Sequence, residues 1–270
     1  MENTTIAQAF DLTDRVAIVT GAGRGLGRAI ASRFAEAGAA VVCADVVGDT
    51  AAETVGLIEA AGGTASAHPV DVTDRAAVDA LIAATVERHG RLDVIVNNAA
   101  IIVDSTVLDT TEEDLDRIMA VNFKGVFFGC QAAGRVMVEQ GSGSIINLAS
   151  GAIDIPTPGL ICYSAAKVAV AQLSRTLAME LAPFQVRVNA IAPGWIDTPM
   201  NERHALRADG TVDPDKKRDY VEHRGSKLSP MGIPGEPDDI AFAALYLASP
   251  AAKFVTGIVM RPNGGSTMPW

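Results

Sequence analysis

The sequence predicts an α/β protein in which a parallel, doubly wound sheet carries helices on both faces. Short apolar runs alternate along the 270 residues with longer segments of helical period, and most of these runs are continuous. Continuous apolar runs are typical of strands covered on both faces. The alternation of strand and helix is typical of parallel sheets joined by right-handed crossovers. No linker or shift of composition divides the chain, so we expect one domain over residues 1–270.

Seven apolar runs are the expected strands, and six segments of helical period between them are the expected helices. Each strand candidate has a length that buried strands take, and the helix candidates are longer. The expected strands span residues 16–20, 40–45, 65–72, 92–99, 143–150, 186–193 and 255–262. The expected helices span residues 25–37, 50–61, 74–89, 111–139, 158–182 and 237–248.

A polar stretch with glycines and prolines, residues 201–234, interrupts this regular order. Segments of that length are typical of lids and binding elements, so we interpret it as a substrate-binding lid. Its charges are mixed, with seven Lys/Arg against six Asp/Glu over residues 201–230, which suits a solvated helical flap. A basic side chain turned inward would instead recognise a carboxylated substrate.

The charge of the chain excludes several classes of partner. The formal net charge is -10, which argues against nonspecific nucleic-acid binding because such binding depends on neutralising phosphates. The same charge disfavours docking on acidic membranes or acidic carrier proteins. No apolar run reaches the roughly 20 residues of a membrane span, and the first ten residues show no secretory pattern.

The cysteines indicate a cytoplasmic protein, and the histidines give no indication of a metal site. The three cysteines are widely spaced in apolar contexts, so a disulfide framework is not expected and a reducing compartment fits. The four histidines show no ligand spacing, so we expect no metal site. Cys162 has no histidine or acid at motif spacing, which disfavours a nucleophilic role.

The stretch "VAIVTGAGRGLGRAI" runs from the first strand through a glycine turn into a helix. Gly21, Gly25 and Gly27 permit a tight turn and a close approach of backbone to a ligand. The helix start that follows offers free N–H groups to a pyrophosphate. The turn therefore predicts a dinucleotide site, with a glycine-rich turn without ligand as the alternative.

Asp45 and Arg24 bear on the choice between NAD and NADP. Asp45 ends the second strand, where a carboxylate accepts hydrogen bonds from the adenosine ribose and repels a 2′-phosphate. Arg24 lies in the glycine turn and would meet such a phosphate, or else is a solvated side chain at the helix start. Asp45 occupies the ribose position directly, so NAD is favoured over NADP.

Polar residues follow the third and fourth strands. Asp71 would face the adenine or belong to the cap region of the next helix, and the sequence leaves both roles open. Asn97 and Asn98 end the fourth strand, where they are turn formers or cofactor contacts. Ligands of open α/β sheets bind outside the carboxyl ends of strands, near the reversal of strand order, which favours a contact.

The stretch "YSAAK" places Tyr163 and Lys167 four residues apart with only small residues between them. Positions i and i+4 share one face of a helix. A phenol has an ordinary pKa of about 10, and a nearby positive charge favours the phenolate. The spacing is therefore that of a tuned acid, although it also arises by chance in ordinary helices.

Seven motifs together make the sequence resemble the short-chain dehydrogenase/reductase superfamily, in the family's order and over about residues 12–267. They are "TGAGRGLG" (20–27), "DVTD" (71–74), "NNAA" (97–100), "VNFKG" (121–125), "INLAS" (146–150), "YSAAK" (163–167) and "VNAIAPGWIDTPM" (188–200). The resemblance implies a single Rossmann-like domain of seven parallel strands in the order 3-2-1-4-5-6-7. It also implies hydride transfer between the nicotinamide C4 and a carbinol or carbonyl carbon.

The resemblance also implies roles for individual residues. Tyr163 would be the general acid or base, Lys167 would lower its pKa together with the oxidised nicotinamide, Ser150 would bind the substrate oxygen and Asn122 would anchor a water. For the last two residues, capping of a loop and satisfaction of backbone groups in a kinked helix are the alternatives. The implied cofactor contacts are Gly21, Arg24, Gly25, Leu26, Gly27, Asp45, Asp71, Val72, Asn98, Ala99, Tyr163, Lys167, Pro193, Gly194, Ile196 and Thr198.

The expected substrate contacts are Ser150, Ile153, Asp154, Tyr163 and Trp195, although Trp195 would otherwise simply pack. Ala100 departs from the family, which usually has glycine there, and a methyl group is tolerable if φ stays negative. The expected substrate is a small alcohol or ketone.

The leading interpretation is an NAD(H)-dependent secondary alcohol dehydrogenase or ketone reductase. An NADPH-dependent 3-oxoacyl-carrier-protein reductase is the alternative, against which Asp45, the net charge and Met179 in "LAMELA" count. A non-catalytic dinucleotide sensor is a third class, disfavoured because Tyr163 and Lys167 are both present. Apolar residues around helices 111–139 and 158–182 predict a homotetramer, with burial inside the same chain as the alternative.

Overall fold

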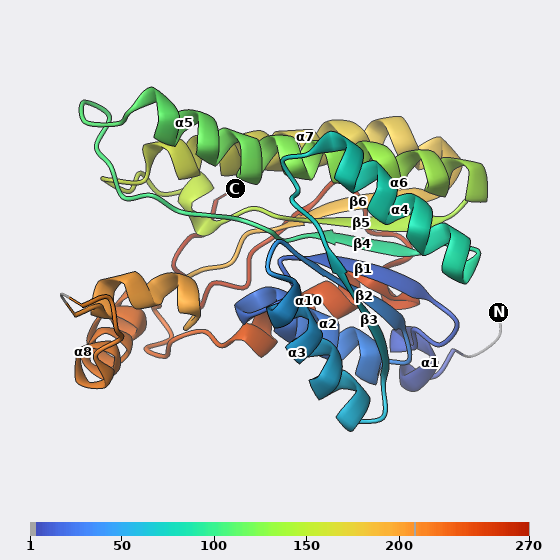
Figure 1. Cartoon of the computed structure of the whole chain (residues 1–270), viewed down its shortest axis with the longest axis horizontal. Coiled ribbons are helices and arrows are strands. Elements are labelled where there is room, and N and C mark those ends of the chain that lie inside the picture. Colours follow the sequence, from blue (N-terminus) through green and yellow to red (C-terminus); the bar gives the residue numbers. More distant parts are fainter. Residues whose placement is uncertain (1–3, 208, 270) are drawn as a thin grey trace.

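One parallel sheet forms the centre of the molecule, and its strand order is β3-β2-β1-β4-β5-β6-β7. The computed structural model describes residues 4–207 and 209–269, so position 208 of the predicted lid lies outside the described residues. The predicted fold class and strand order are confirmed (Figure 1). The strands are β1 (Val16–Thr20), β2 (Ala40–Asp45), β3 (Thr64–Pro69), β4 (Val94–Asn97), β5 (Gly143–Leu148), β6 (Val186–Ile191) and β7 (Val259–Met260).

Helices cover both faces of this sheet, as the continuous apolar strands require (Figure 1). One face packs against α2 (Gly25–Glu36), α3 (Gly48–Ala60) and α10 (Pro237–Ala248). The other packs against α4 (Arg75–His89), α6 (Val126–Gln140) and α7 (Ile161–Leu181). The remaining helices are α1 (Ile6–Phe10), α5 (Glu112–Met119), α8 (Pro214–Asp219) and α9 (Ser226–Leu228).

Alternate residues of each strand feed the two layers of core. Val19 of β1 packs with Phe34 of α2, whereas its neighbour Ile18 packs with Leu81 of α4. Successive side chains of a strand point to opposite faces, which is why the apolar run of β1 is unbroken. All five residues of β1 are buried.

Five of the seven strands end earlier than the apolar runs predict, and β1 and β2 end where predicted. The predicted strand 92–99 stops at Asn97, because the backbone N–H groups of Asn98 and Ala99 turn to the hydroxyl of Thr20. The predicted strand 255–262 is reduced to Val259–Met260, because Gly257 has φ +75° and interrupts the extended backbone. Residues at the carboxyl ends thus leave the sheet to form loops.

The long predicted helix 111–139 is interrupted. A π-helical turn, Ala120–Gly125, joins α5 to α6. Cβ and Cγ2 of Val72 lie where a side chain on Gly125 would project, at 3.0 Å and 2.8 Å from a Cβ built there. Only glycine therefore fits at this position, and the extra residue in the turn brings Asn122 to the interior of the molecule. The predicted helix 158–182 begins later, at Ile161, after Gly159 with φ +85°.

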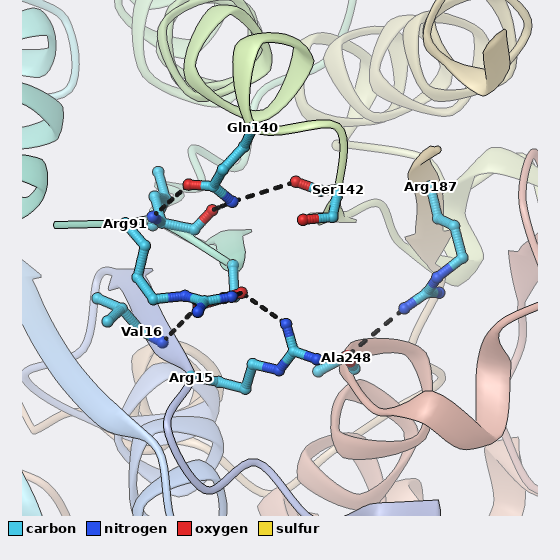
Figure 2. A network of polar contacts seen from close by, with 9 residues as sticks. Arg15, Val16, Arg91, Gln140, Ser142, Arg187 and Ala248 are labelled. Carbon is cyan, nitrogen blue, oxygen red and sulfur yellow. Dashed lines mark hydrogen bonds and ion pairs between the residues drawn. The ribbon is translucent and has the colours of Figure 1, made fainter. Parts of the chain in front are cut away.

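The amino-terminal edge of the sheet is cross-linked by Asp93, which is 5% exposed. Its carboxylate accepts hydrogen bonds from Arg91 at 2.7 Å and 2.6 Å, from Arg15 at 2.8 Å and from the backbone N–H of Val16 at 2.9 Å. Figure 2 shows Arg15, Val16 and Arg91 gathered at this place. Burial raises the pKa of Asp93, but these donors outweigh it, so the pKa lies below its usual value. Arg187 nearby donates to the carbonyl oxygen of Ala248 at 3.5 Å. These groups are used in holding the sheet together, and the opposite edge carries the site.

Among the described residues, no helix combines the length and the apolar character that crossing a membrane would need.

Candidate active site

The glycine turn after β1 depends on its glycines. Gly21 has φ +64° and Gly25 has φ +55°, which L-residues with a side chain rarely adopt. A Cβ on Gly21 would lie 2.9 Å from Cα of Ala99, and a Cβ on Gly27 would collide with the carbonyl oxygen of Gly21. The chain therefore turns as tightly as backbone packing allows.

Asn98 fastens this turn to the end of β4. Its Nδ2 donates to the carbonyl oxygens of Thr20 at 2.8 Å and Gly21 at 3.2 Å. Thr20 returns the contact, since its Oγ1 accepts from the N–H groups of Asn98 and Ala99 at 3.0 Å and 3.1 Å. Sequence analysis missed this role of Thr20. Its position directly before Gly21 was the feature that could have indicated it. The ends of β1 and β4 thus form one rigid corner.

The start of α2 fits a pyrophosphate. Arg24 is the N-cap residue, it is exposed, and its side chain makes no capping hydrogen bond. The first N–H groups of α2, at Gly25 and Leu26, therefore have no side-chain cap, and such groups bind anions readily. The exposure of Arg24 agrees with a solvated side chain, and the phosphate contact stays a prediction.

Asp45 lies at the end of β2 against the same turn. Its Oδ2 accepts from the N–H of Gly23 at 2.9 Å, and its Oδ1 accepts from the N–H of Val47 at 3.0 Å. Each oxygen keeps a further lone pair, so the carboxylate retains the capacity to accept from a ribose hydroxyl. Arg28, which sequence analysis missed, donates to the carbonyl oxygen of Gly23 and so stabilises the glycine turn.

The loop after β6 closes over the glycine turn. A Cβ on Gly25 would lie 3.7 Å from Cβ of Thr198 and 3.5 Å from Cδ of Pro199. Thr198 is 9% exposed and Ile196 is 4% exposed, so this loop is part of the packed body. Pro193 is tied to the loop after β5, because its carbonyl oxygen accepts from Gly151 N–H at 2.8 Å. Predicted cofactor contacts from distant parts of the chain therefore meet at one edge.

Two of the predicted cofactor contacts, Asp71 and Val72, make contacts within the protein itself. Asp71 is exposed and accepts from the backbone N–H and the hydroxyl of Thr73, at 2.9 Å and 2.8 Å. The cap of α4 is Asp74, which accepts from Ala76 N–H at 2.8 Å. Val72 is half-buried and packs into the core on the α4 side. Asp71 thus shapes the turn that leads into the cap.

Lys167 is buried and fixed. It is 1% exposed, and its Nζ donates to the carbonyl oxygen of Leu148 at 2.7 Å. The same Nζ lies 5.7 Å from the centre of the Tyr163 ring. Burial lowers the pKa of Lys167 to about 8. The predicted pairing of Tyr163 and Lys167 on one helix face is therefore present, with the last residue of β5 as an anchor that sequence analysis missed.

Tyr163 lies between Ser150 and Lys167. Burial raises the pKa of the phenol, and a hydrogen bond with Ser150 and the charge of Arg203 oppose that rise only in part. The combined effect of the protein residues is thus a raised pKa of Tyr163, and the lowering of that pKa by Lys167 stays a prediction. A bound oxidised nicotinamide would add the positive charge that the prediction also named.

Ser150 and Asn122 both make local contacts. Ser150 is the N-cap of the turn Gly151–Ile153, and its Oγ accepts from Ala152 N–H at 3.2 Å. Asn122 is 0% exposed, donates from Nδ2 to Ile101 O at 2.8 Å and accepts at Oδ1 from Ile101 N–H at 2.9 Å. The local alternatives considered for both residues are therefore realised, and their catalytic roles stay predictions.

The predicted substrate contacts do not all present free groups. Asp154 is paired with Arg261 at 2.7 Å and 3.2 Å and also accepts from the hydroxyl of Thr267 at 3.2 Å. Its carboxylate is therefore engaged within the protein. Ile153 packs against the small core cluster around Ala149.

Trp195 faces the lid rather than the core. Its ring centre lies 5.9 Å from that of Tyr220, and its buried Nε1 donates to no partner among the described residues. The lid leaves and rejoins the body at one point, a bridge between Ile196 and Gly235, with Asp197 N–H donating to Gly235 O at 2.9 Å. Figure 1 shows the lid helix α8 standing away from the sheet.

Arg203 of the lid is a contact that no sequence pattern marked. Its Nε donates to Oδ2 of Asp104 at 2.8 Å, which joins the lid to the loop after β4.

No cluster of His, Cys, Asp and Glu within residues 4–207 and 209–269 has the geometry of a metal site. Ala100 is not among the non-glycine residues with positive φ, which are Asp14 and Gln185 in the described chain. The condition for tolerating alanine there is met.

Comparisons with known proteins agree on one family. The family model described as "Enoyl-(Acyl carrier protein) reductase" matches residues 21–267. The 3beta-hydroxysteroid dehydrogenase 1 of Eggerthella lenta is 41% identical over 262 residues, covering 96% of this chain and 95% of that protein. The 3-oxoacyl-acyl-carrier-protein reductase FabG of Thermotoga maritima is 36% identical over 254 residues, covering 94% of this chain and 98% of that protein.

A solved structure of a short-chain type dehydrogenase/reductase from Mycobacterium marinum is similar over its whole length. It has a TM-score of 0.89 and 34% identity, and the match covers 98% of this chain and 100% of that chain. With the sheet order, the glycine turn and the Tyr163–Lys167 pair, these matches identify the family. The chain belongs to the short-chain dehydrogenase/reductase superfamily, whose members are oxidoreductases that bind a nicotinamide cofactor.

Proposed function

We propose that this protein is an NAD(H)-dependent oxidoreductase that interconverts a secondary alcohol and a ketone, with Tyr163 as general acid and base. The observation that carries the proposal is the fixed position of Lys167, held on Leu148 O at 2.7 Å with its Nζ 5.7 Å from the Tyr163 ring. A buried lysine is costly, and such groups concentrate at functional sites. Its place at the carboxyl end of β5, on the same edge of the sheet as the glycine turn, supports a catalytic use of the phenol.

In this proposal the protein residues divide the work of moving one proton. Tyr163 gives its hydroxyl proton to the substrate oxygen in reduction and takes it back in oxidation. Ser150 donates a hydrogen bond to the same oxygen and stabilises the charge that develops there. Lys167 supplies positive charge behind the phenol, and Asn122 anchors a water through which protons pass. The nicotinamide, when bound, supplies or accepts the hydride.

The proposal is tested by a screen of hydroxylated compounds with NAD and NADP side by side. Turnover of one or more secondary alcohols with NAD supports it, and no turnover of any alcohol or ketone with a cofactor that binds favours a sensor. A strong preference for NADP contradicts the hypothesis that Asp45 makes the protein select NAD.

Asp45 is expected to set the choice of cofactor, because a carboxylate at the end of the second strand accepts from ribose hydroxyls and repels a 2′-phosphate. Replacing Asp45 by Asn keeps the shape but removes the charge that repels a 2′-phosphate. We expect the ratio of kcat/KM for NAD to that for NADP to fall about tenfold, which is about 1.4 kcal/mol. Asp49→Asn, an exposed acid in the first turn of α3, is the matched control and should leave the ratio unchanged.

An NADPH-dependent 3-oxoacyl-acyl-carrier-protein reductase is the second candidate, since the matching family model and the Thermotoga maritima relative carry acyl-carrier-protein names. Recognition of an acidic carrier needs unpaired basic residues near the mouth. The lid lysine Lys217 is instead paired with Glu202 at 2.9 Å, and Arg218 with Asp215 at 2.7 Å. Reduction of a carrier-bound 3-oxoacyl thioester by NADPH would favour this candidate.

We also infer a homotetramer, because the chain exposes two separate apolar faces. One face lies on α5, α6 and α7 and includes Phe127, Val168 and Met179, of which Met179 is 79% exposed. The other lies on α10 and the segment after it and includes Phe242 and Phe254, which is 99% exposed. A tetramer with dihedral symmetry needs two different self-complementary interfaces per chain. Light scattering should give the mass of four chains, and a monomer at micromolar concentration contradicts the inference.

A cytoplasmic location is part of the same proposal. Cys43, Cys130 and Cys162 are all free and buried. A chain without disulfides suits a reducing compartment.

A further inference from the structure

The segment that follows β7 contacts three loops at the carboxyl end of the sheet. It lies against the loop after β6, where the N–H of Gly194 donates to Pro262 O at 3.1 Å. A Cβ on Gly194 would lie 2.7 Å from Cα of Asn263, so the two backbones are in close contact. The segment also receives the end of the predicted lid, because Ser229 Oγ donates to Gly264 O at 3.1 Å. The third loop is the one after β5.

An ion pair makes the contact with the loop after β5. Arg261 Nε donates to Asp154 Oδ2 at 2.7 Å, and Arg261 Nη2 donates to Asp154 Oδ1 at 3.2 Å. On its other side Arg261 Nη1 donates to Val259 O at 2.8 Å. The hydroxyl of Thr267 donates to Asp154 Oδ2 at 3.2 Å. The side chains of Arg261 and Asp154 are 22% and 14% exposed. A bidentate pair of this kind fixes the orientation of the groups that it joins as well as their distance.

Asp154 closes the turn that begins at Ser150. The N–H of Ile153 donates to Ser150 O at 3.1 Å, and the N–H of Asp154 donates to Gly151 O at 3.0 Å. The turn is also tied at its start, because the N–H of Gly151 donates to Pro193 O at 2.8 Å. None of the three residues of the turn is fully buried, so core packing does not by itself fix it. Its polar contacts at both ends therefore decide where it lies.

The position of this turn matters for the proposed chemistry. Ser150 is the residue that would hydrogen-bond the substrate oxygen, and its Oγ already takes part in the turn by accepting from Ala152 N–H at 3.2 Å. Displacement of such a group by about 1 Å can cost about 10²-fold in rate. A buried ion pair adds little to stability on average, because loss of hydration offsets the attraction. A use in positioning therefore accounts for the pair of Asp154 and Arg261 better than a use in stability.

We propose that Asp154 is a positioning residue of the proposed reaction: held by Arg261, it fixes the turn that begins at Ser150 and so keeps the Ser150 hydroxyl where it meets the substrate oxygen. This role rests on the proposed function, because that function gives Ser150 its task. Asp154 itself binds neither substrate nor cofactor, and no bond forms or breaks at it. Through Arg261 the segment after β7 supports catalysis, although it lies outside the seven motifs of the sequence.

Asp154→Asn and Ser150→Ala, alone and combined, test this role. Asp154→Asn keeps the size of the side chain but removes the charge that Arg261 grips, so kcat should fall about tenfold as the turn loosens. KM for NAD should stay within about twofold, because the glycine turn keeps all its contacts. In the Ser150→Ala background, Asp154→Asn should cost nothing further in kcat, since residues that act as a unit are not additive. A merely structural role would lower kcat by the same factor in both backgrounds.

Asp238→Asn is the matched control. Asp238 also accepts two hydrogen bonds from one arginine, Arg33, at 3.1 Å and 2.7 Å, but this pair joins α10 to α2 and touches no loop of the site. Asp238→Asn should leave kcat within about twofold of the parent value. Arg261→Lys is a milder second variant that keeps the charge without the bidentate geometry. It should give a smaller loss that also disappears in the Ser150→Ala background, and NADH fluorescence counts the folded sites in each preparation.

The outcomes separate this role from the proposed function. Equal losses in the two backgrounds, or an Asp154→Asn enzyme with the parent kcat, overturn the role of Asp154 and leave the proposed function standing. Full turnover of Ser150→Ala contradicts the task given to Ser150, and the role of Asp154 fails with it. Full turnover of Tyr163→Phe overturns the proposed function itself, whatever Asp154 does.

Discussion

Replacing Tyr163 by Phe is expected to lower kcat about 10²–10⁴-fold, the usual range for loss of a general acid or base. The ring stays and only the hydroxyl is lost, so packing beside Lys167, with its Nζ 5.7 Å from the ring centre, is preserved. Binding of NADH, followed by its fluorescence, should change less than threefold, because the reacting oxygen contributes to the transition state more than to ground-state binding. Steady-state kinetics in both directions measures the effect.

Ser164→Ala is the matched control for this experiment. Ser164 is the next residue along α7, and its Oγ has no hydrogen-bond partner among the described residues. Loss of that hydroxyl should leave kcat within about twofold of the parent value, since it acts on no reacting group. A Tyr163→Phe enzyme with nearly full turnover would falsify the acid–base assignment and return Tyr163 to the status of a packing residue.

Replacing Lys167 by Met is expected to abolish most turnover and yet to stabilise the fold at neutral pH. The kcat loss should reach about 10²-fold or more, as for other preorganised charges at an active site. The pKa of Lys167 is about 8 in the folded protein against a model value of 10.5. At pH 7 the fold therefore carries a buried ammonium at a cost of about 3 kcal/mol, partly offset by about 1 kcal/mol from its hydrogen bond to Leu148. Met removes both contributions.

The sign of the pH dependence follows from proton binding. Because the folded pKa is the lower one, the unfolded chain binds more protons between about pH 8 and pH 10.5, and the contribution of Lys167 to stability rises across that window. Lys167→Met should therefore be more stable than the parent by about 2 kcal/mol at pH 7, and this advantage should shrink toward pH 10.5. Urea unfolding at both pH values and one protein concentration measures it.

Lys124→Met, at an exposed lysine of the π-helical turn, is the control and should change stability by no more than about 0.5 kcal/mol. A Lys167→Met variant that is less stable than the parent at pH 7 would show that the Leu148 contact outweighs the burial of charge. In that case the lysine would be a structural tie as much as a functional one.

Local periodicity predicted the frame of this protein well. Strands 16–20 and 40–45 and helix 237–248 have the predicted bounds, because their apolar residues are buried on both faces or along one stripe. The interruptions were missed where one residue changes the backbone, as at Gly257 with φ +75°. The π-helical turn at Gly125 depends on contact with Val72, which no local pattern reveals.

The site divides in the same way. The glycine turn, Asp45 and the Tyr163–Lys167 pair belong to short motifs, so their places were predictable. The pairing of Asp154 with Arg261 joins residues 107 positions apart, and that of Arg203 with Asp104 joins residues 99 positions apart. Charges scattered over a polar lid give no indication of which one turns inward. Partner choice across such distances is decided by the folded surface.

The bridge between Ile196 and Gly235 has a consequence for how this protein can change over generations. Beyond Thr198 and Pro199, the chain extends outward before it returns to Gly235, and the entropic cost of closing a loop grows only with the logarithm of its length. A lineage can therefore exchange this outer part for a shorter, longer or differently charged one while it inherits the sheet intact. New recognition chemistry can be acquired there as long as the contacts of Thr198 and Pro199 with the glycine turn are kept.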